Sequence, residues 1–238
     1  MTCFLTSSPC LPGEIELCRD NGFRAALLQA LAEPCRCLYI ASDPDDIEKT
    51  DFYAGEMRAI MERSGLRFSS FIILDSRNDE QTEELVMQAE LIVLAGGHVP
   101  TQNAFFQKIG LRKIISGFNG VIMGISAGTM NAADIVYAHP ERQGEALMPR
   151  EARFLHGLGL TKAMVLPHFQ ENRNDILDGL RTLEDIAFPD SYGRTFYALV
   201  DGSWIHTCCG HTTLYGEAYA ISNGVMTQIL QAGESMTL

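Results

Sequence analysis

The sequence lacks the features that would direct the chain to a membrane or to nucleic acid. No apolar run approaches the roughly 18 residues that a membrane-spanning helix needs, and the segment from Met1 to Ser8 lacks the basic and long apolar regions of a signal peptide. Basic residues are scarce, because 18 lysines and arginines face 30 aspartates and glutamates, which gives a net charge of −12. Such a chain is repelled by phosphate backbones and by anionic lipids. We therefore expect a cytoplasmic protein with no nucleic-acid and no membrane partner.

Cysteine is present but lacks the arrangement of a metal site. The seven cysteines are odd in number, and neither Cys35 with Cys37 nor Cys208 with Cys209 has the paired spacing of a zinc site. In a cytoplasmic chain we expect all seven to be reduced thiols that serve as packing residues. The sequence implies no metal and no organic cofactor.

The composition is that of a globular protein with a sizeable core. Of the 238 residues, 46% are hydrophobic and 20% are charged. No linker, internal repeat or low-complexity segment divides the chain. We therefore predict one domain that spans residues 1–238.

The first 135 residues alternate between apolar strand-like runs and amphipathic segments of helical period. We predict strands at residues 3–7, 36–41, 68–74, 91–94 and 121–123, and helices at 22–32, around 52–61, at 78–89 and at 101–117 with a break at Gly110. Strands separated by helices of this length form βαβ units. The predicted fold class is α/β, a doubly wound and mostly parallel sheet with helices on both faces.

The sequence pattern changes after residue 135. A polar segment at 145–158 is predicted to be partly helical, residues 163–166 to form another buried strand, and residues 172–188 to form a helix. From Tyr192 onward, short strand-like runs are separated by turns, and Asn223-Gly224 between two of them is a strong hairpin signal. We expect the sheet to end in C-terminal antiparallel hairpins.

The most informative stretch is Gly124-Ile125-Ser126-Ala127-Gly128, which follows an apolar strand and precedes a small-residue helix at 127–133. Strand, tight turn and helix are the context in which the pattern G-x-S-x-G indicates a nucleophile elbow. The two glycines are expected to make room for a serine in a strained turn. The turn would expose the Ser126 hydroxyl and aim the Ala127 N–H at an oxyanion.

Two further loops follow predicted strands and therefore belong at the edge of the sheet where ligands bind. Gly96 and Gly97 come after the strand at 91–94, and two glycines let a backbone approach a ligand, so Gly97 is a candidate second oxyanion donor. The neighbouring His98 is a candidate substrate contact. His168 is the best placed of the six histidines to act as the base that a serine nucleophile needs, because it is the first polar residue after a buried strand.

The residue that would orient this base is left open by the pattern alone. Asp201 ends a strand-like run at an Asp-Gly turn, and Glu141 lies in the loop after the Ser126 helix. Acidic residues are also common in turns and loops that have no catalytic role.

Four segments, in order, resemble the peptidase E and cyanophycinase family of serine peptidases, whose fold is related to that of class I glutamine amidotransferases. The matching segments are Gly96-Gly97 with Thr101-Gln102, the motif around Ser126, Pro167-His168-Phe169, and Leu199 to Ile205. Together they span most of the chain, and four motifs in the right order are far more specific than one. Val99 and Pro100 lengthen the first segment relative to the family pattern.

The resemblance implies the roles of four residues: Ser126 as nucleophile, His168 as base, and the N–H groups of Gly97 and Ala127 as oxyanion hole. For the third member of the triad it leaves two candidates. We prefer Asp201 over Glu141, because the sequence around Asp201 matches the family closely.

The resemblance also implies a substrate class. Peptidase E cleaves dipeptides with an N-terminal aspartate, and it needs a basic group to hold that carboxylate. Its arginine-rich stretch is echoed here only by Arg173 and Arg181, and Arg194 competes for the role. The predicted partner is a small peptide substrate, with Gly96 and His98 also in contact with it, and a homodimer is left open.

The leading hypothesis is a serine hydrolase that cleaves an amide bond through a Ser-His-acid triad. An α/β-hydrolase esterase would need the order serine, acid, histidine, for which the candidates are Ser126, then Asp190 or Asp201, then His206 or His211. Too few βα units follow the elbow for that fold. A glutamine amidotransferase needs cysteine at position 126. The alternative from another class is a non-catalytic binding or regulatory protein on the same scaffold.

Overall fold

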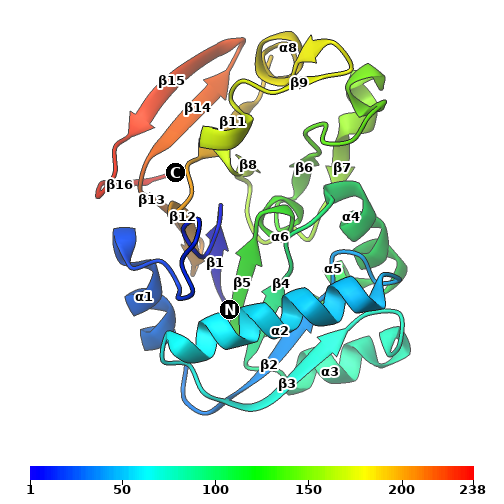
Figure 1. Cartoon of the computed structure of the whole chain (residues 1–238), viewed down its shortest axis with the longest axis vertical. Coiled ribbons are helices and arrows are strands. Elements are labelled where there is room, and N and C mark those ends of the chain that lie inside the picture. Colours follow the sequence, from blue (N-terminus) through cyan, green and yellow to red (C-terminus); the bar gives the residue numbers. More distant parts are fainter.

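A central eight-stranded sheet organises the molecule (Figure 1). The computed structural model describes all 238 residues, Met1–Leu238. The strands of this sheet are β1 (Thr2–Thr6), β2 (Cys35–Ile40), β3 (Phe68–Leu74), β4 (Leu91–Leu94), β5 (Val121–Ile125), β12 (Trp204–Cys208), β13 (His211–Tyr215) and β16 (Ser235–Thr237). Their order is β16-β13-β12-β1-β5-β4-β2-β3. The pairs among β1 to β5 are parallel, whereas β12, β13 and β16 extend the sheet antiparallel beyond β1.

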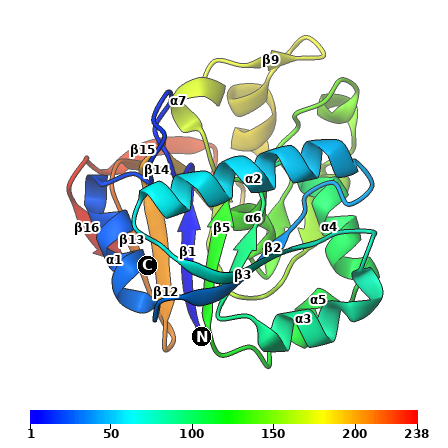
Figure 2. The ribbon, with the colours of Figure 1, turned by 60° about the horizontal axis from the view of Figure 1, so that its bottom comes forward.

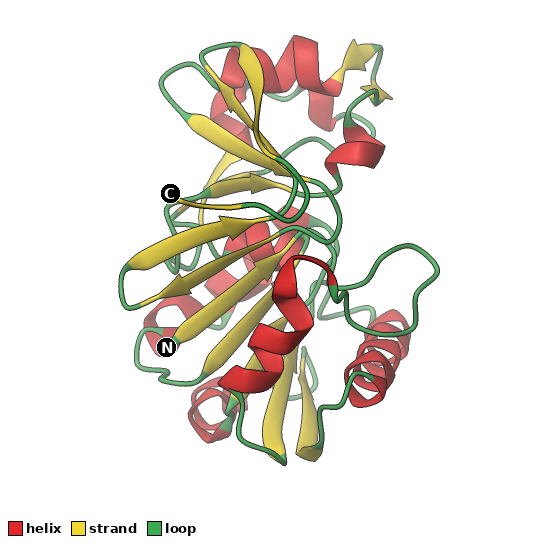
Figure 3. Ribbon diagram, turned by 90° about the vertical axis from the view of Figure 1, so that its left-hand side faces the viewer, coloured by secondary structure: helices red, strands yellow, loops and turns green.

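Helices cover both faces of this sheet (Figure 3). One face carries α1 (Phe23–Ala30) and α2 (Ile47–Arg63), and the other carries α3 (Thr82–Gln88), α4 (Val99–Lys108), α5 (Leu111–Ile115) and α6 (Ala127–Asn131). Successive strand residues point to opposite faces, so Ile92 and Leu94 enter one core while Leu91 and Val93 enter the other. A strand buried on both faces is apolar throughout, which explains the uninterrupted runs in the sequence. The predicted α/β fold, doubly wound and mostly parallel, is confirmed.

The longest helix, α2, has clear start and stop signals. The Asp46 carboxylate accepts a hydrogen bond from the Lys49 N–H at 3.2 Å and caps the first turn. At the other end Gly65 adopts φ 109°, a conformation that favours glycine, and the Leu66 N–H bonds back to the Met61 carbonyl. No helix of the structure is both long and apolar enough to cross a membrane.

The C-terminal strands divide between two sheets, whereas the sequence suggested hairpins on a single sheet. The second sheet contains β8 (Met164–Leu166), β11 (Thr195–Leu199), β14 (Ala218–Ser222) and β15 (Val225–Leu230), in the order β15-β14-β11-β8. On one face its strands bury side chains such as Leu166 and Phe196 in a third core. Val165 and Leu199 instead enter a core of the central sheet. The predicted hairpin at Asn223-Gly224 joins β14 to β15, and both turn residues have positive φ.

The helix predicted at residues 172–188 is wrong. The helix α7 (Phe169–Asn172) is a single turn, and a small hairpin of β9 (Ile176–Leu177) and β10 (Leu180–Arg181) follows it. The cause is Asp178-Gly179, whose φ angles of 54° and 82° make a tight turn inside the predicted helix. Helical structure resumes only at η5 (Thr182–Ala187) and α8 (Phe188–Asp190).

The remaining elements are short. The strand β6 (Ile135–Tyr137) pairs antiparallel with β7 (Phe154–His156), and the polar segment before β7 folds as two helical turns, η3 (Glu145–Leu147) and η4 (Arg150–Arg153). Two further turns, η1 (Asp20–Gly22) and η2 (Asp79–Gln81), precede α1 and α3.

All seven cysteines are free thiols. Four of them, Cys3, Cys18, Cys35 and Cys37, are buried as packing residues. The prediction that all seven serve this purpose is wrong for Cys209, which is exposed beside the turn between β12 and β13.

Candidate active site

The predicted elbow is present, and Ser126 lies at its strained point. Ser126 joins β5 to α6 with φ 47° and ψ −108°, a combination that a residue with a side chain rarely adopts. Position 128 is glycine because a Cβ there would lie 2.7 Å from the Leu94 carbonyl carbon, and a Cβ at Gly124 would lie 2.9 Å from the Thr129 hydroxyl oxygen. The glycines thus allow α6 to pack closely on β4 and β5. They do not relieve crowding against the serine itself, which was the role expected from sequence.

The Gly96-Gly97 loop lies beside this elbow. An ideal Cβ at Gly96 would lie 3.6 Å from the Ser126 Cβ. Gly97 has φ 151°, and a Cβ there would lie 2.7 Å from the Ser42 Cβ and would overlap the Ser42 hydroxyl. The Gly97 N–H makes no hydrogen bond within the chain. Gly97 therefore has an unbonded backbone donor, and it lines the same cavity as Ser126.

His168 follows β8 and is held by an acid and a serine. Its Nδ1 lies 2.9 Å from the Asp201 Oδ1, and its backbone N–H donates to the Ser7 Oγ at 2.8 Å. The Ser7 hydroxyl in turn donates to the same Asp201 oxygen at 2.7 Å. The other Asp201 oxygen accepts from the Gln170 side-chain amide at 2.8 Å. An imidazole whose Nδ1 proton is donated to a carboxylate leaves Nε2 free to accept a proton.

These contacts shift the pKa of both groups. Burial disfavours the charged imidazole, but the hydrogen bond and negative charge of Asp201, with Glu171 and Glu141 nearby, outweigh it and raise the pKa of His168. Burial also opposes the ionised form of Asp201, yet hydrogen bonds from His168, Ser7 and Gln170 lower its pKa. Asp201 is therefore an ionised carboxylate with 7% of its side chain exposed.

One cavity of about 590 Å³ brings these groups together. Gly96, Gly97 and Ser126 from the central sheet and His168 from the second sheet all line it, and residues of α2 form the opposite wall. Figure 2 shows α2 crossing in front of β5 and α6. No three His, Cys, Asp or Glu side chains are grouped in a way that could hold a metal ion.

Glu141 lies on another side of His168. Both residues line a small cavity of about 30 Å³, and the Glu141 carboxylate accepts no hydrogen bond from the chain. Burial of this carboxyl group and repulsion from Glu145 raise the pKa of Glu141 to about 7, although His168 opposes the shift and the residue as a whole remains exposed. Glu141 is thus near the imidazole without orienting it.

His98 does not line the large cavity. Its Nδ1 lies 2.7 Å from the Thr101 hydroxyl and its Nε2 lies 2.7 Å from a Glu145 carboxylate oxygen. The other Glu145 oxygen accepts the N–H groups of Glu141 and Arg142. His98 therefore holds the loop that carries Glu141, and the structure does not place it as the substrate contact predicted from sequence.

The predicted arginines also lie outside the cavity. The exposed Arg173 guanidinium lies 5.6 Å from the centre of the Phe169 ring, and Arg181 forms an ion pair of 2.6 Å with Asp185. Among the lysines and arginines, only Lys49 of α2 lines the cavity, and it forms no ion pair.

Asp190 and the two histidines that an esterase triad would need are not at the cavity. Asp190 is buried in an ion pair of 2.6 Å with Arg153 and accepts the Tyr137 hydroxyl at 2.9 Å. His206 and His211 lie on β12 and β13 and do not line the large cavity.

Sequence reasoning missed Ser7, Gln170 and the wall formed by α2. Ser7 follows β1, the neighbour of β5, so its place beside the elbow follows once the strand order is known. Gln170 is two residues after His168, where a helical turn returns its amide towards Asp201. The sequence signal for the cavity wall formed by α2 was the pair Phe52 and Tyr53, two aromatic residues on the exposed face of that helix.

Comparison with known proteins gives the family of the chain and the fold that it shares. The model of peptidase family S51 matches residues 26–215. A solved structure of a peptidase E candidate from Listeria monocytogenes superposes with a TM-score of 0.56 at 16% sequence identity, over 96% of this chain and 98% of that chain. At this identity the superposition shows the shared fold alone. The comparison with curated proteins found no match. Since the family model covers most of the chain and includes the elbow, the chain belongs to peptidase family S51 and is a serine-type peptidase.

Proposed function

We propose that the protein hydrolyses a peptide bond in small peptides through a triad of Ser126, His168 and Asp201. The observation that carries the proposal is the position of His168: its Nδ1 is bonded to Asp201 at 2.9 Å while the residue lines the same cavity as Ser126. A serine is a weak nucleophile until an adjacent base removes its proton. The free Nε2 of His168 is the base that this cavity offers.

The steps follow from this arrangement. Ser126 Oγ attacks the carbonyl carbon of the scissile bond while His168 Nε2 takes its proton. The oxygen of the tetrahedral intermediate is stabilised by the N–H groups of Gly97 and Ala127, the latter at the start of α6. His168 then gives the proton to the leaving amine, and water releases the acyl group by the same route. Each oxyanion donor contributes about 3 kcal/mol to the transition state.

We assign the orienting role to Asp201 rather than to Glu141. The Asp201 side chain is 7% exposed, ionised and bonded to the imidazole, with Ser7 and Gln170 each donating to one of its two oxygens. Glu141 accepts no hydrogen bond and has a pKa raised to about 7, so near neutral pH it is only partly ionised. A group that is often protonated stabilises an imidazolium less than a permanent carboxylate does.

Intact-mass analysis after treatment with a fluorophosphonate tests the proposal. We expect one adduct on the wild type and none on Ser126→Ala, because only an activated serine reacts. An adduct on both proteins would place the reactive group elsewhere. A folded wild type that takes no adduct would favour the alternative of a non-catalytic binding protein on the same scaffold.

A panel of dipeptides then tests the substrate class, with the release of a free amine as the readout. It includes N-terminal aspartate, because the family resemblance implies that preference, together with neutral and basic residues. Hydrolysis of any of them by the wild type and not by Ser126→Ala supports a peptidase of small peptides. Hydrolysis of esters alone would contradict the assignment.

A further inference from the structure

One wall of the catalytic cavity is formed by a single face of α2. The residues of this face that line the cavity are Lys49, Thr50, Phe52, Tyr53, Glu56, Met57 and Ile60, and Tyr39 of β2 lies with them. Spacings of three and four residues bring these side chains to one side of the helix. We call this surface the α2 wall. It is continuous with Ser126 and His168 across the same cavity, so a group bound at the serine can reach it.

The α2 wall is rich in apolar side chains that water still reaches. Phe52 is 62% exposed and Tyr53 is 55% exposed, with their ring centres 5.3 Å apart and edge to face. Met57 and Ile60 extend the apolar surface along the helix. Aromatic rings in the wall of a catalytic cavity are the usual means of burying an apolar ligand group.

The charges around the cavity do not suit an acidic side chain. The carboxylates of Asp43 and Glu56 line it together with one ammonium group, that of Lys49. A substrate carboxylate would therefore meet two negative charges for each positive one. Arg173 and Arg181, the arginines expected to hold such a group, point to other partners.

We propose that the α2 wall is the subsite for an apolar side chain, so that the preferred substrates are small peptides with an aromatic or long aliphatic residue on the acyl side of the scissile bond. This inference rests on the proposed function of Ser126. The side chain of the attacked residue lies against Phe52, Tyr53 and Met57 while its carbonyl oxygen meets the Gly97 N–H. Substrate binding then removes the exposed rings from water.

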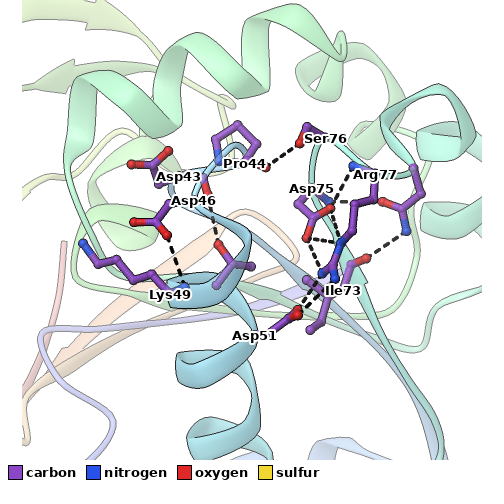
Figure 4. Close-up of polar contacts among 11 residues, drawn as sticks. Asp43, Pro44, Asp46, Lys49, Asp51, Ile73, Asp75, Ser76 and Arg77 are labelled. Atoms are coloured by element: carbon purple, nitrogen blue, oxygen red, sulfur yellow. Dashed lines mark hydrogen bonds and ion pairs between the residues drawn. The ribbon is translucent and has the colours of Figure 1, made fainter.

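A network of charged residues fixes the N-terminal half of α2, as Figure 4 shows. Asp75, at the end of β3, is fully buried and accepts from Arg77 Nε at 3.0 Å and from Nη2 at 2.6 Å. The same guanidinium bonds both oxygens of Asp51 on α2 at 2.6 Å and 3.0 Å. Such a fork holds one helical turn in a defined position.

The loop before α2, which contains Asp43 and Pro44, is also held by hydrogen bonds. The Ser76 hydroxyl donates to the Pro44 carbonyl at 2.7 Å, and Thr50 donates to the Asp43 carbonyl at 2.9 Å. Figure 4 places Asp43 and Lys49 together on the opposite side of the helix from Asp51 and Arg77. The α2 wall is therefore preformed, and a preformed subsite loses little affinity to ordering on binding.

Diphenyl phosphonates that carry the side chain of one amino acid test the subsite directly, because they modify the serine only after the side chain is bound. We measure the rate at which Ser126 of the full chain is modified by the phenylalanine, leucine and aspartate analogues. We expect the phenylalanine analogue to react about tenfold faster than the aspartate analogue, or more, as apolar pockets discriminate by such factors. Phe52→Ala and Tyr53→Ser should remove most of this ratio.

Matched variants control for general effects. Met87→Ala removes an exposed apolar side chain on α3, away from the cavity, and should leave the ratio unchanged. Phe52 and Tyr53 are exposed, so their variants are expected to fold, which circular dichroism checks.

Several outcomes would overturn the inference. One is a faster reaction of the aspartate analogue, most clearly if Lys49→Met abolishes it, which would make Lys49 the carboxylate-binding group. Another is a Phe52→Ala variant in which the ratio of the phenylalanine and aspartate rates is unchanged but a dimer becomes a monomer in sedimentation. The rings would then form a contact between two copies of the chain. Modification of Ser126 by a plain fluorophosphonate but with equal rates for all three analogues would overturn the subsite alone. No modification by any reagent would overturn the proposed function and the subsite with it.

Discussion

The two halves of the active site are held in place by different physical means. The elbow and the Gly96-Gly97 loop are fixed by steric contact, since a Cβ at Gly97 or Gly128 would overlap Ser42 or Leu94. His168 is fixed by the hydrogen bond that its N–H donates to Ser7, and Asp201 is fixed by the hydrogen bonds that it accepts from Ser7 and Gln170. In the first half, Gly97 and Gly128 have no room for an added Cβ, and in the second half, a lost hydroxyl would leave a polar group without its partner. Each half should therefore respond to a different kind of substitution.

The largest effect is expected from removing the nucleophile. Ser126→Ala should lower kcat/KM by about 10⁴-fold or more, as loss of the serine does in other triads. The melting temperature should stay nearly unchanged, because the hydroxyl makes no hydrogen bond within the chain. Peptide hydrolysis and calorimetry measure both quantities. Residual activity above about one part in a hundred would remove Ser126 as the nucleophile.

The next effect separates the two acids around His168. Asp201→Asn should lower kcat by about 10³-fold, because the amide no longer stabilises the imidazolium. Glu141→Gln should cost less than about tenfold, since Glu141 forms no hydrogen bond to the base. Steady-state kinetics on the two variants measure the difference. If Glu141→Gln proves the more damaging change, the acid of the triad is Glu141.

The steric half is tested by adding one carbon atom. Gly97→Ala should lower kcat by about 10²-fold, because the new Cβ displaces the loop that offers the oxyanion donor. Gly13→Ala is the matched control, since Gly13 also has positive φ but has no atom within 4 Å of an added Cβ. The control should carry the backbone strain without the loss of rate. Equal losses of kcat in the two variants would contradict a role for the Gly97 N–H.

The hydrogen-bonded half is tested by removing a hydroxyl. Ser7→Ala leaves the His168 N–H without an acceptor and Asp201 without one donor. We expect a loss of about 1 to 3 kcal/mol in the free energy of unfolding, with a decrease in kcat/KM of about tenfold. Ser7→Thr keeps the hydroxyl and should restore part of the rate. Denaturant titration and kinetics distinguish this from a purely structural effect, in which kcat would not change.

The smallest effect is a shift of the pH profile. The base acts only when neutral, and the pKa of His168 is raised above its ordinary value of 6.5, so kcat/KM should rise with pH and reach half its maximum above pH 6.5. In Asp201→Asn the stabilising charge is absent, and the acidic limb of the residual activity should move to lower pH. A limb that stays in place would show that Asp201 does not set this pKa.

Much of the central sheet follows from local pattern. The bounds predicted for β3 and β4 agree with the structure. The four residues of β4 are all buried and leave an unbroken apolar run. β3 is an edge strand in which only Leu74 is buried, and the apolar residues 71–74 were its signal. The elbow follows from five residues. Gly97 and His168 were selected because they follow other predicted strands, and the structure places both around one cavity with Ser126.

The rest depends on contacts between residues that are far apart in the chain. Ser7 and Asp201 are separated by 194 positions, and no local signal joins them. The second sheet was missed because short strands do not reveal which sheet they join. By contrast, the hairpin at Asp178-Gly179 could have been predicted from the sequence. Asp-Gly is a hairpin turn signal of the same kind as Asn223-Gly224, which was predicted correctly.

The distance along the chain between nucleophile and base has a consequence for biosynthesis. The ribosome delivers β1 to β5 and the elbow before it delivers His168, and Asp201 comes later still. A nascent chain can pair β1 with β5 and form Ser126, yet it holds no oriented base until β11 has emerged. With the proposed triad, activity on small peptides therefore arises only near the end of synthesis.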